Sequence, residues 1–209
     1  MSVDLDHILW AAPDLDSGTA LLARLTGVAP ARGGSHTGLG TRNSLVGLAG
    51  AQYLEVIAPD PEQTTIGDRA ATIAALPQPG LMTFAVRTSN LDAYRAAAET
   101  TGVDIHGPVG MSRARPDGVR LDWACLYVDH PVYGDLIPFA IDWQGSPHPS
   151  EVVPQGLGLA RFEVLHPEPE PLRRIYEALG IGIEVMRAAR PGLRAVLATP
   201  RGDVTLLGP

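Results

Sequence analysis

Lysine is absent from this sequence, and all 16 basic residues are arginines. A chain without lysine cannot form a Schiff base through a lysine amine, cannot hold pyridoxal phosphate in that way and lacks the lysine of a P-loop phosphate clamp. The arginines are scattered, and 23 acidic residues give a formal net charge of −7. We therefore expect neither nucleic acid nor a membrane surface as a partner.

Cysteine and long apolar runs are also scarce. Cys125 is the single cysteine, which excludes an internal disulfide framework. No apolar run approaches the roughly 20 residues that a membrane helix needs. The first six residues carry two acids in place of the basic start of a signal peptide. These features predict a cytoplasmic globular protein, and the hydrophobic fraction of 45% is enough for a sizeable core.

The first strand and helix signals lie close together near the start of the chain. Residues 3–12 form an apolar segment typical of a buried strand, and Pro13 ends it. Asp14 then begins a helix, which Gly27 ends. The apolar stripe of this helix is expected to contain Ala20, Leu21, Leu22 and Leu25. Three strand-like segments follow, near residues 28–34, 42–49 and 52–58.

The same order recurs twice along the chain. Strand-like segments begin at Leu81 and Leu159 as the first does near Leu5. Each is followed by a helix that ends at a glycine, Gly102 in one case and Gly180 in the other. Equivalent positions recur at nearly equal spacing, which favours a structural repeat over the alternative of unrelated strand–helix units.

The sequence therefore predicts an α+β fold of tandem β-α-β-β-β modules, with the first two forming a cupped mixed sheet and a third module added. The predicted boundaries are 1–60 for the first module, 61–79 for a connector with a helix-like run at 66–76, 80–145 for the second module, 146–156 for a linker and 157–209 for the third. A third module leaves a sheet edge and an uncovered face. We expect it either to pack against the first pair or to pair with its equivalent in a homodimer.

Potential ligands gather in the first module, around a glycine-rich stretch at residues 33–43. The candidates are His7, His36, Arg42, Asn43 and Glu55. A buried glutamate requires a polar partner, so His7 and Glu55 either meet at a divalent ion or form a direct hydrogen-bonded pair. His36 is expected to be a third metal ligand, because sets of two histidines and one carboxylate bind iron and related ions. Without a metal, His36 suits a general acid or base.

Neighbouring residues on a strand point to opposite faces, so only one of Arg42 and Asn43 can face a pocket. Arg42 suits a carboxylate of the substrate, and Asn43 suits a carbonyl or an amide. Tyr53 and Trp143 lie in strand-like segments. We expect both aromatic side chains to contact the substrate, because small-molecule pockets usually have an apolar lining.

Several motifs recur in one known family. They are Leu5-Asp6-His7, Pro13-Asp14-Leu15, Gly33-Gly34-Ser35-His36 followed by Gly40-Thr41-Arg42-Asn43, Tyr53-Leu54-Glu55, and Pro138-Phe139-Ala140-Ile141-Asp142-Trp143. Over residues 3–145 the sequence thereby resembles the glyoxalase-like domains of the vicinal oxygen chelate superfamily, which includes glyoxalases, bleomycin-resistance proteins and dioxygenases. The third module resembles them only in the order of its elements.

The resemblance implies that two modules pair around a metal and a substrate. It also implies that a module supplies one metal ligand from its first strand and one from its last. His7 and Glu55 occupy these places in the first module. The equivalent residues are Thr83 with Pro138 or Phe139 in the second module, and Arg161 with Leu206 in the third.

Three functions of different classes agree with these features. The first is a metal-dependent lyase or dioxygenase that acts on a small oxygenated metabolite, with His36 and Glu55 as catalytic groups and Zn, Mn, Fe or Ni as the metal. Its metal ligands would be His7, His36 and Glu55, and its substrate-binding residues Arg42, Asn43, Tyr53 and Trp143. The alternative is a non-catalytic protein that binds a small molecule or an antibiotic at a degenerate metal site. A regulatory or scaffold module with an empty cup is the third.

Overall fold

The first predicted module is present in the computed structural model, which describes residues 3–114 and 118–209. Its elements are β1 (Asp4–Ala11), α1 (Leu15–Thr26), β2 (Ala31–His36), β3 (Thr41–Gly47) and β4 (Tyr53–Pro59). Asp14 caps α1 by accepting a hydrogen bond from the Ser17 backbone N–H, and Gly27 ends the helix with a left-handed φ of 80°. The predicted start and end of this helix are confirmed.

The predicted apolar stripe of α1 was wrong at two positions, because Ala20 and Leu25 are exposed. The helix residues that are buried are Leu15, Gly18, Leu22 and Thr26. A Cβ atom on Gly18 would lie 2.5 Å from Ala12 Cβ and 3.3 Å from Val56 Cγ1. The helix therefore approaches the strands at a residue without a side chain, which a stripe defined by large apolar residues does not reveal.

The other two modules repeat the order of elements. The connector holds α2 (Asp68–Ala74). The second module consists of β5 (Gly80–Arg87), α3 (Leu91–Glu99), β6 (Asp104–Ala114), β7 (Arg120–Asp129) and β8 (Phe139–Asp142), with a 3₁₀ turn, η1 (Gly134–Leu136), before β8. The linker holds the 3₁₀ turn η2 (Pro149–Glu151). The third module consists of β9 (Gly158–His166), α4 (Pro169–Leu179), β10 (Glu184–Arg187), β11 (Gly192–Thr199) and β12 (Gly202–Leu207).

The described strands form an eight-stranded sheet in the order β2-β3-β4-β1-β5-β8-β7-β6 and a four-stranded sheet in the order β10-β9-β11-β12. The α+β fold with a sheet shared by the first two modules is thus confirmed. In each of those modules the first strand lies beside the last, β1 beside β4 and β5 beside β8. The third module differs, because β9 lies between β11 and β10 and runs parallel to β10.

The chain divides into two compact units. One, here called the Glu55 unit, contains Ile8–Met82, His148–Arg161 and Ala195–Pro209. The other, here called the His7 unit, contains the chain up to His7 together with Thr83–Pro147 and Phe162–Arg194. Among the described residues, no helix combines the length and the apolar character needed to cross a membrane.

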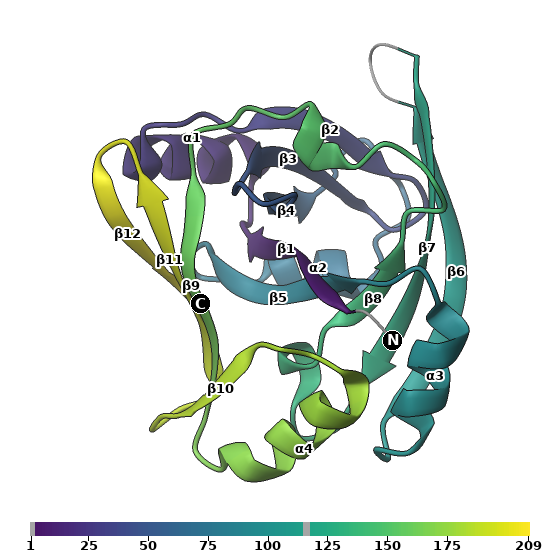
Figure 1. Ribbon diagram of the computed structural model, residues 1–209. Coiled ribbons are helices and arrows are strands. Elements are labelled where there is room, and N and C mark those ends of the chain that lie inside the picture. The colour runs from purple at the N-terminus through teal and green to yellow at the C-terminus, as the bar shows by residue number, and fades with distance from the viewer. Residues whose placement is uncertain (1–2, 115–117) are drawn as a thin grey trace. The chain divides into compact units, whose positions relative to one another are not determined.

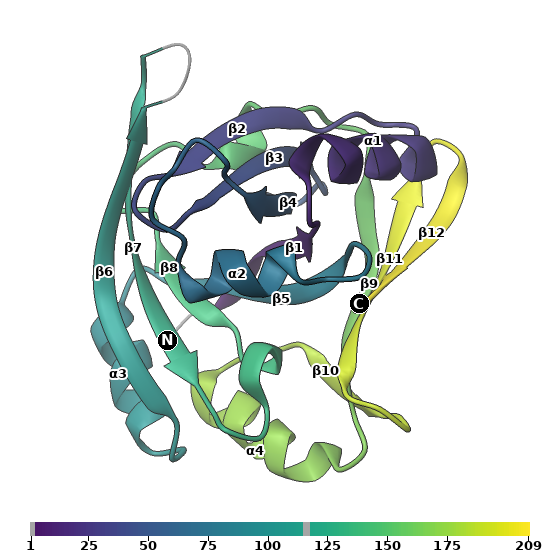
Figure 2. The same ribbon diagram turned by 180° about the vertical axis from the view of Figure 1, so that it is seen from behind.

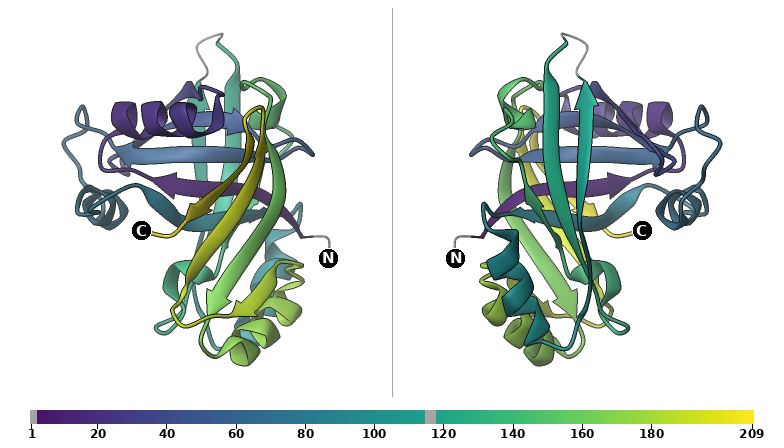
Figure 3. Two further views of the ribbon diagram at one scale, coloured as in Figure 1. Left: turned by 90° about the vertical axis from the view of Figure 1, so that its left-hand side faces the viewer. Right: turned by 90° about the vertical axis from the view of Figure 1, so that its right-hand side faces the viewer.

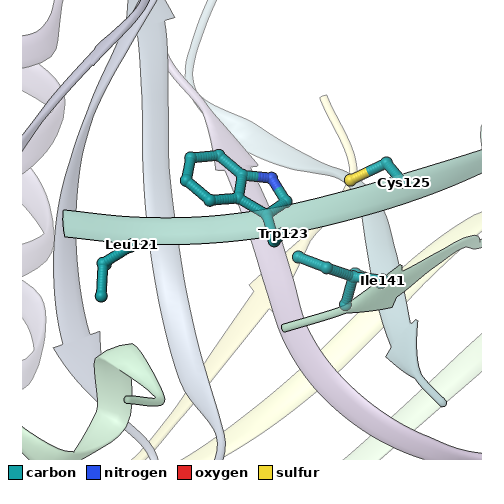
Figure 4. Packing of buried hydrophobic residues seen from close by; sticks show 5 residues of the cluster. Leu121, Trp123, Cys125 and Ile141 are labelled. Carbon is teal, nitrogen blue, oxygen red and sulfur yellow. The ribbon is translucent and has the colours of Figure 1, made fainter. Parts of the chain in front are cut away.

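Each unit has its own packing. In the Glu55 unit, α1 and α2 both pack against β4 (Figure 1, Figure 2). In the His7 unit, β6 runs beside β7 as a long antiparallel pair (Figure 3). A buried cluster lies on β5, β7 and β8 of this unit and consists of Ala85, Leu121, Trp123, Cys125 and Ile141 (Figure 4). Its cysteine is a buried part of the packing.

Candidate functional site

Strand register brings three of the predicted residues to one face of the Glu55 unit. Asn43 on β3 lies opposite Gly34 of β2 and Ile57 of β4. His36 lies two residues beyond Gly34 on β2, and Glu55 two residues before Ile57 on β4. Side chains that lie opposite on paired strands, or two apart on one strand, share a face. His36, Asn43 and Glu55 therefore converge.

A hydrogen-bond network joins these side chains. Asn43 Nδ2 donates to Glu55 Oε1 at 2.7 Å and lies 3.1 Å from His36 Nε2. The Gly34 backbone N–H donates to Asn43 Oδ1 at 3.0 Å, which fixes the orientation of the amide. Because an amide nitrogen only donates, His36 Nε2 accepts, and the ring proton lies on Nδ1, 2.9 Å from Thr41 Oγ1. We refer to His36, Thr41, Asn43 and Glu55 as the Glu55 cluster.

The Glu55 cluster is largely buried. Glu55 is 5% exposed and Asn43 is 6% exposed. Oε1 of Glu55 lies 3.6 Å from His36 Nε2, so protonation of the ring would create an ion pair with the carboxylate. The His36 side chain is 17% exposed to solvent, and the Glu55 side chain is 7% exposed. The histidine is thus the member of this acid–base pair with better access to solvent.

Arg42 is not brought to the Glu55 cluster. It alternates with Asn43 along β3 and so points to the opposite face. Its positive charge helps to lower the pKa of two carboxyl groups there, those of Asp14 and Asp60. Its buried Nε atom hydrogen-bonds to no group in the described part of the chain. Of the two side chains, Asn43 is therefore the one that lies with His36 and Glu55, and a substrate contact of either residue stays a prediction.

Tyr53 lies on the same strand face as Glu55, two residues earlier on β4. Its side chain is buried, with its ring 5.6 Å from the His148 ring of the linker at an angle of 60°. The linker also contacts β3 closely, since a Cβ atom on Gly47 would lie 2.5 Å from the Gln155 side-chain amide. Tyr53 is therefore a packed residue beside the Glu55 cluster, at the end covered by the linker.

His7 belongs to the other unit, where it is held by a carboxylate. His7 Nδ1 lies 2.6 Å from Oδ1 of the fully buried Asp6, and Trp143 Nε1 donates to the other carboxylate oxygen of Asp6 at 3.0 Å. The His7 ring meets Phe139 edge-on at 5.7 Å. Trp143, predicted to bind substrate, thus binds Asp6, and its ring also lies 5.7 Å from that of Trp123. A carboxylate on one ring nitrogen fixes the tautomer and orientation of a histidine.

The Asn43 amide bridges His36 and Glu55, and this arrangement does not present their facing atoms to a divalent metal. The two atoms that would bind the ion, His36 Nε2 and Glu55 Oε1, already receive the two amide protons of Asn43. An amide NH₂ group has no lone pair to offer a metal. Across residues 3–114 and 118–209, no three His, Cys, Asp or Glu side chains are grouped so that they could hold an ion.

Three residues that the sequence did not single out take part in these networks. Thr41 lies two residues before Asn43 on β3, so strand alternation could have identified it. Asp6 is a carboxylate inside an otherwise apolar strand, which is a signal for a buried polar partner. Gln63 lies in the connector beyond β4 and contacts the backbone on both sides of the 36–41 turn. No pattern in the sequence points to Gln63.

Comparison with solved structures finds proteins with a similar fold. A solved structure of a hypothetical protein from Staphylococcus aureus is similar over 99% of this chain and 85% of its own, with 17% identity and a TM-score of 0.66. A methylmalonyl-CoA epimerase in complex with methylmalonyl-CoA and NH4+ is similar over 71% of this chain and 100% of its own, with 18% identity and a TM-score of 0.50. The epimerase from Mycobacterium tuberculosis has 23% identity over 66% of this chain and 86% of its own, with a TM-score of 0.46.

These structural similarities concern the fold. A comparison with curated proteins gives no match. The profile of the family described as "Glyoxalase-like domain" matches residues 5–180, which include both modules of the eight-stranded sheet, the Glu55 cluster and His7. The chain belongs to the glyoxalase-like domain family.

Proposed function

We propose that the chain binds a small oxygenated metabolite at the Glu55 cluster and moves a proton at the carbon next to the carbonyl group of that metabolite. The observation that carries this proposal is the buried Glu55 carboxylate, with His36 Nε2 at 3.6 Å from its Oε1 atom. Two titratable groups held this close in a buried place suit the roles of general base and general acid. Membership of the glyoxalase-like family supports a role with small molecules.

In the proposed step Glu55 removes the proton. The C–H bond breaks, an O–H bond forms on the carboxyl group, and the electron pair moves to the carbonyl oxygen as an enolate. Return of the proton to carbon restores the carboxylate. His36 exchanges protons with solvent beside it, because its ring keeps more exposure than Glu55. Asn43 fixes the direction of the carboxylate through its 2.7 Å hydrogen bond to Oε1.

Exchange of carbon-bound hydrogen in D₂O tests this step. Acyl thioesters, 2-hydroxy ketones and 2-oxo acids are incubated with the protein, and deuterium uptake is followed by NMR. Glu55→Gln is expected to lower the uptake rate by about 10²–10⁴-fold, the usual contribution of a positioned base. The matched control is Glu62→Gln, because Glu62 is exposed and its backbone N–H, not its side chain, binds Asp60. Equal uptake by wild type and Glu55→Gln would contradict the proposal.

The metal set of His7, His36 and Glu55 stays a prediction, as do substrate contacts of Arg42, Tyr53 and Trp143. Metal analysis of protein purified without chelator tests the metal set. The proposed step needs no metal, so metal below the protein concentration, unchanged in His7→Ala and Glu55→Ala, is the expected result. One equivalent of Zn, Mn, Fe or Ni that both variants lose would overturn the metal-free step.

The non-catalytic alternative is favoured by one observation, the Asn43 amide that already binds both His36 and Glu55. A protein of this kind would hold its ligand by shape and apolar contact. Thermal shifts with a panel of metabolites and antibiotics distinguish the two functions. A ligand that stabilises wild type and Glu55→Gln equally, with no deuterium uptake in either, identifies a binder.

A further inference from the structure

One side chain from the connector, Gln63, forms several hydrogen bonds with the turn that follows His36. Gln63 Nε2 donates to the His36 carbonyl oxygen at 3.2 Å and to the Thr41 carbonyl oxygen at 3.4 Å. Its Oε1 accepts from the Gly38 N–H at 2.8 Å and from the Gly40 N–H at 3.4 Å. One primary amide thus binds backbone groups at the start, the middle and the end of the 36–41 turn.

Gln63 is itself held in place. Its Nε2 also lies 3.0 Å from Asp60 Oδ2, so its two hydrogens are shared among three acceptors, and its backbone N–H donates to the Asp60 carbonyl oxygen at 3.2 Å. The other carboxylate oxygen of Asp60 accepts from the Glu62 N–H at 3.1 Å. The Asp60 N–H donates to the Gly40 carbonyl oxygen at 2.9 Å. Asp60 is only 5% exposed, and its hydrogen bonds to Gln63 and Glu62 are partly buried.

The turn also has little room to move on its connector side. A Cβ atom on Gly40 would lie 2.6 Å from the Thr65 carbonyl oxygen, and one on Gly67 would lie 3.0 Å from the Leu39 carbonyl oxygen. Gly38 and Gly40 both have positive φ, 81° and 70°. Glycine is the residue that adopts this conformation without strain, and here it also lets the two backbones approach.

The two carbonyl groups that Gln63 binds belong to the two residues whose side chains meet in the Glu55 cluster, since His36 Nδ1 lies 2.9 Å from Thr41 Oγ1. We propose that Gln63 is the positioning residue of the Glu55 cluster, and that it sets the tautomer and the direction of the His36 ring through the backbone of the 36–41 turn. This inference rests on the proposed function in one respect, because the acid–base role of the His36 ring comes from that proposal.

NMR of protein with ¹⁵N-labelled histidine tests the inference without any substrate. In the wild type, His36 is expected to show one protonated and one unprotonated ring nitrogen, with Nδ1 protonated. In Gln63→Ala and in the equally long Gln63→Met, the two ring signals are expected to move toward each other as the tautomers mix. Backbone exchange at Gly38 and Gly40 is expected to become at least about tenfold faster, because the acceptor that protects both N–H groups is gone.

The matched control is Gln155→Ala. Gln155 lies in the same unit and also donates to two backbone carbonyl groups, those of Ser150 and Val153, at 2.7 and 2.9 Å. This variant is expected to leave the His36 signals unchanged. Wild-type ring signals in both folded Gln63 variants, or equal changes in Gln155→Ala, would overturn the inference. Because this readout needs no turnover, it fails or succeeds independently of the deuterium uptake test with Glu55→Gln.

Discussion

Asn43 determines how the acid–base pair of the Glu55 cluster is held. Its nitrogen lies within hydrogen-bond distance of one carboxylate oxygen and one ring nitrogen, and its oxygen accepts from the Gly34 N–H. All the hydrogen-bonding groups of this buried amide therefore have partners. Loss of the amide would take one donor from Glu55 and one from His36 at the same time, and hydrogen bonds to charged groups contribute more than those between neutral ones.

Asn43→Leu is accordingly expected to lower the free energy of unfolding by about 1–3 kcal/mol, the usual penalty for a buried polar group that loses its partner. Urea unfolding measures the change. The double variant Asn43→Leu with Glu55→Leu is expected to lose less than the sum of the two single variants, because the second change removes the carboxylate that the first deprived of its donor. Strictly additive losses would contradict the described network.

Asp6 performs a similar task in the His7 unit, where its two oxygens bind His7 and Trp143. Asp6→Leu is expected to reduce the free energy of unfolding by about 1–3 kcal/mol. It is also expected to change the near-UV circular dichroism of tryptophan, because Trp143 loses its acceptor. Asp92→Leu, a change at an exposed residue in the first turn of α3, serves as the control and should leave the spectrum as it is. An unaltered spectrum in Asp6→Leu would show that the Trp143 bond does not form.

At the scale of residues, strand alternation made much of the candidate site predictable. His36, Asn43 and Glu55 were all expected near one another, and the structure brings them together. Alternation also required that Arg42 and Asn43 diverge, but which of them turns toward Glu55 depends on the register of β3 with β4. Asp6 binds Trp143, and Gln63 binds the 36–41 turn, through hydrogen bonds between residues far apart in the sequence, and such bonds leave no periodic trace in it.

At the scale of elements, the sequence predicted the start and end of α1 correctly but its buried side wrongly. Asp14 and Gly27 gave the start and end of the helix because capping depends on local residue chemistry. The buried side depends on the partner surface. Gly18 permits a contact at which a Cβ atom would lie 2.5 Å from Ala12 Cβ. The order of elements in the third module was predictable in the same local way, whereas the sheet order β10-β9-β11-β12 depends on pairing between distant strands.

Gly18→Ala tests this close contact. Alanine favours a helix over glycine by about 1 kcal/mol, so an open site would gain stability. At this position overpacking is expected to outweigh the gain and to lower the free energy of unfolding by about 1–3 kcal/mol. Thermal and urea unfolding measure the effect. Gly182→Ala is the control, because nothing lies within 4 Å of its Cβ position. A stabilised Gly18→Ala protein would mean that α1 has room to move away.

At the scale of the whole molecule, the free energy of unfolding should decrease at low pH. Burial raises the pKa of Asp60, but hydrogen bonds from Ser35, Gln63 and the Glu62 N–H, together with the charge of Arg42, outweigh burial and lower that pKa below 3.8. A carboxyl group with a lowered pKa stabilises the folded state above its unfolded value and ceases to do so as the pH falls through its folded value. The predicted loss therefore lies below about pH 3.8.

Asp60→Asn is expected to reduce the free energy of unfolding at pH 7 and to make it less sensitive to pH below 4. Urea unfolding at several pH values measures both effects. Asp203→Asn is the control, because Asp203 is exposed on β12 and should change neither. An Asp60→Asn protein with the acid sensitivity of the wild type would assign that sensitivity to other carboxyl groups, such as Asp14, whose pKa the Ser17 backbone N–H lowers.

The two compact units do not coincide with the three repeats of the chain. The chain passes between the two units within β1, β5, β9 and β11 and once between Pro147 and His148, so each unit is assembled from separate stretches of sequence. The third module even supplies Ala195–Pro209 to the Glu55 unit, where Arg201 donates to the Arg24 carbonyl oxygen at the end of α1. No single cut in the gene would release either unit intact. Each repeat therefore contributes to both units, and a repeat expressed alone would lack part of the packing of each.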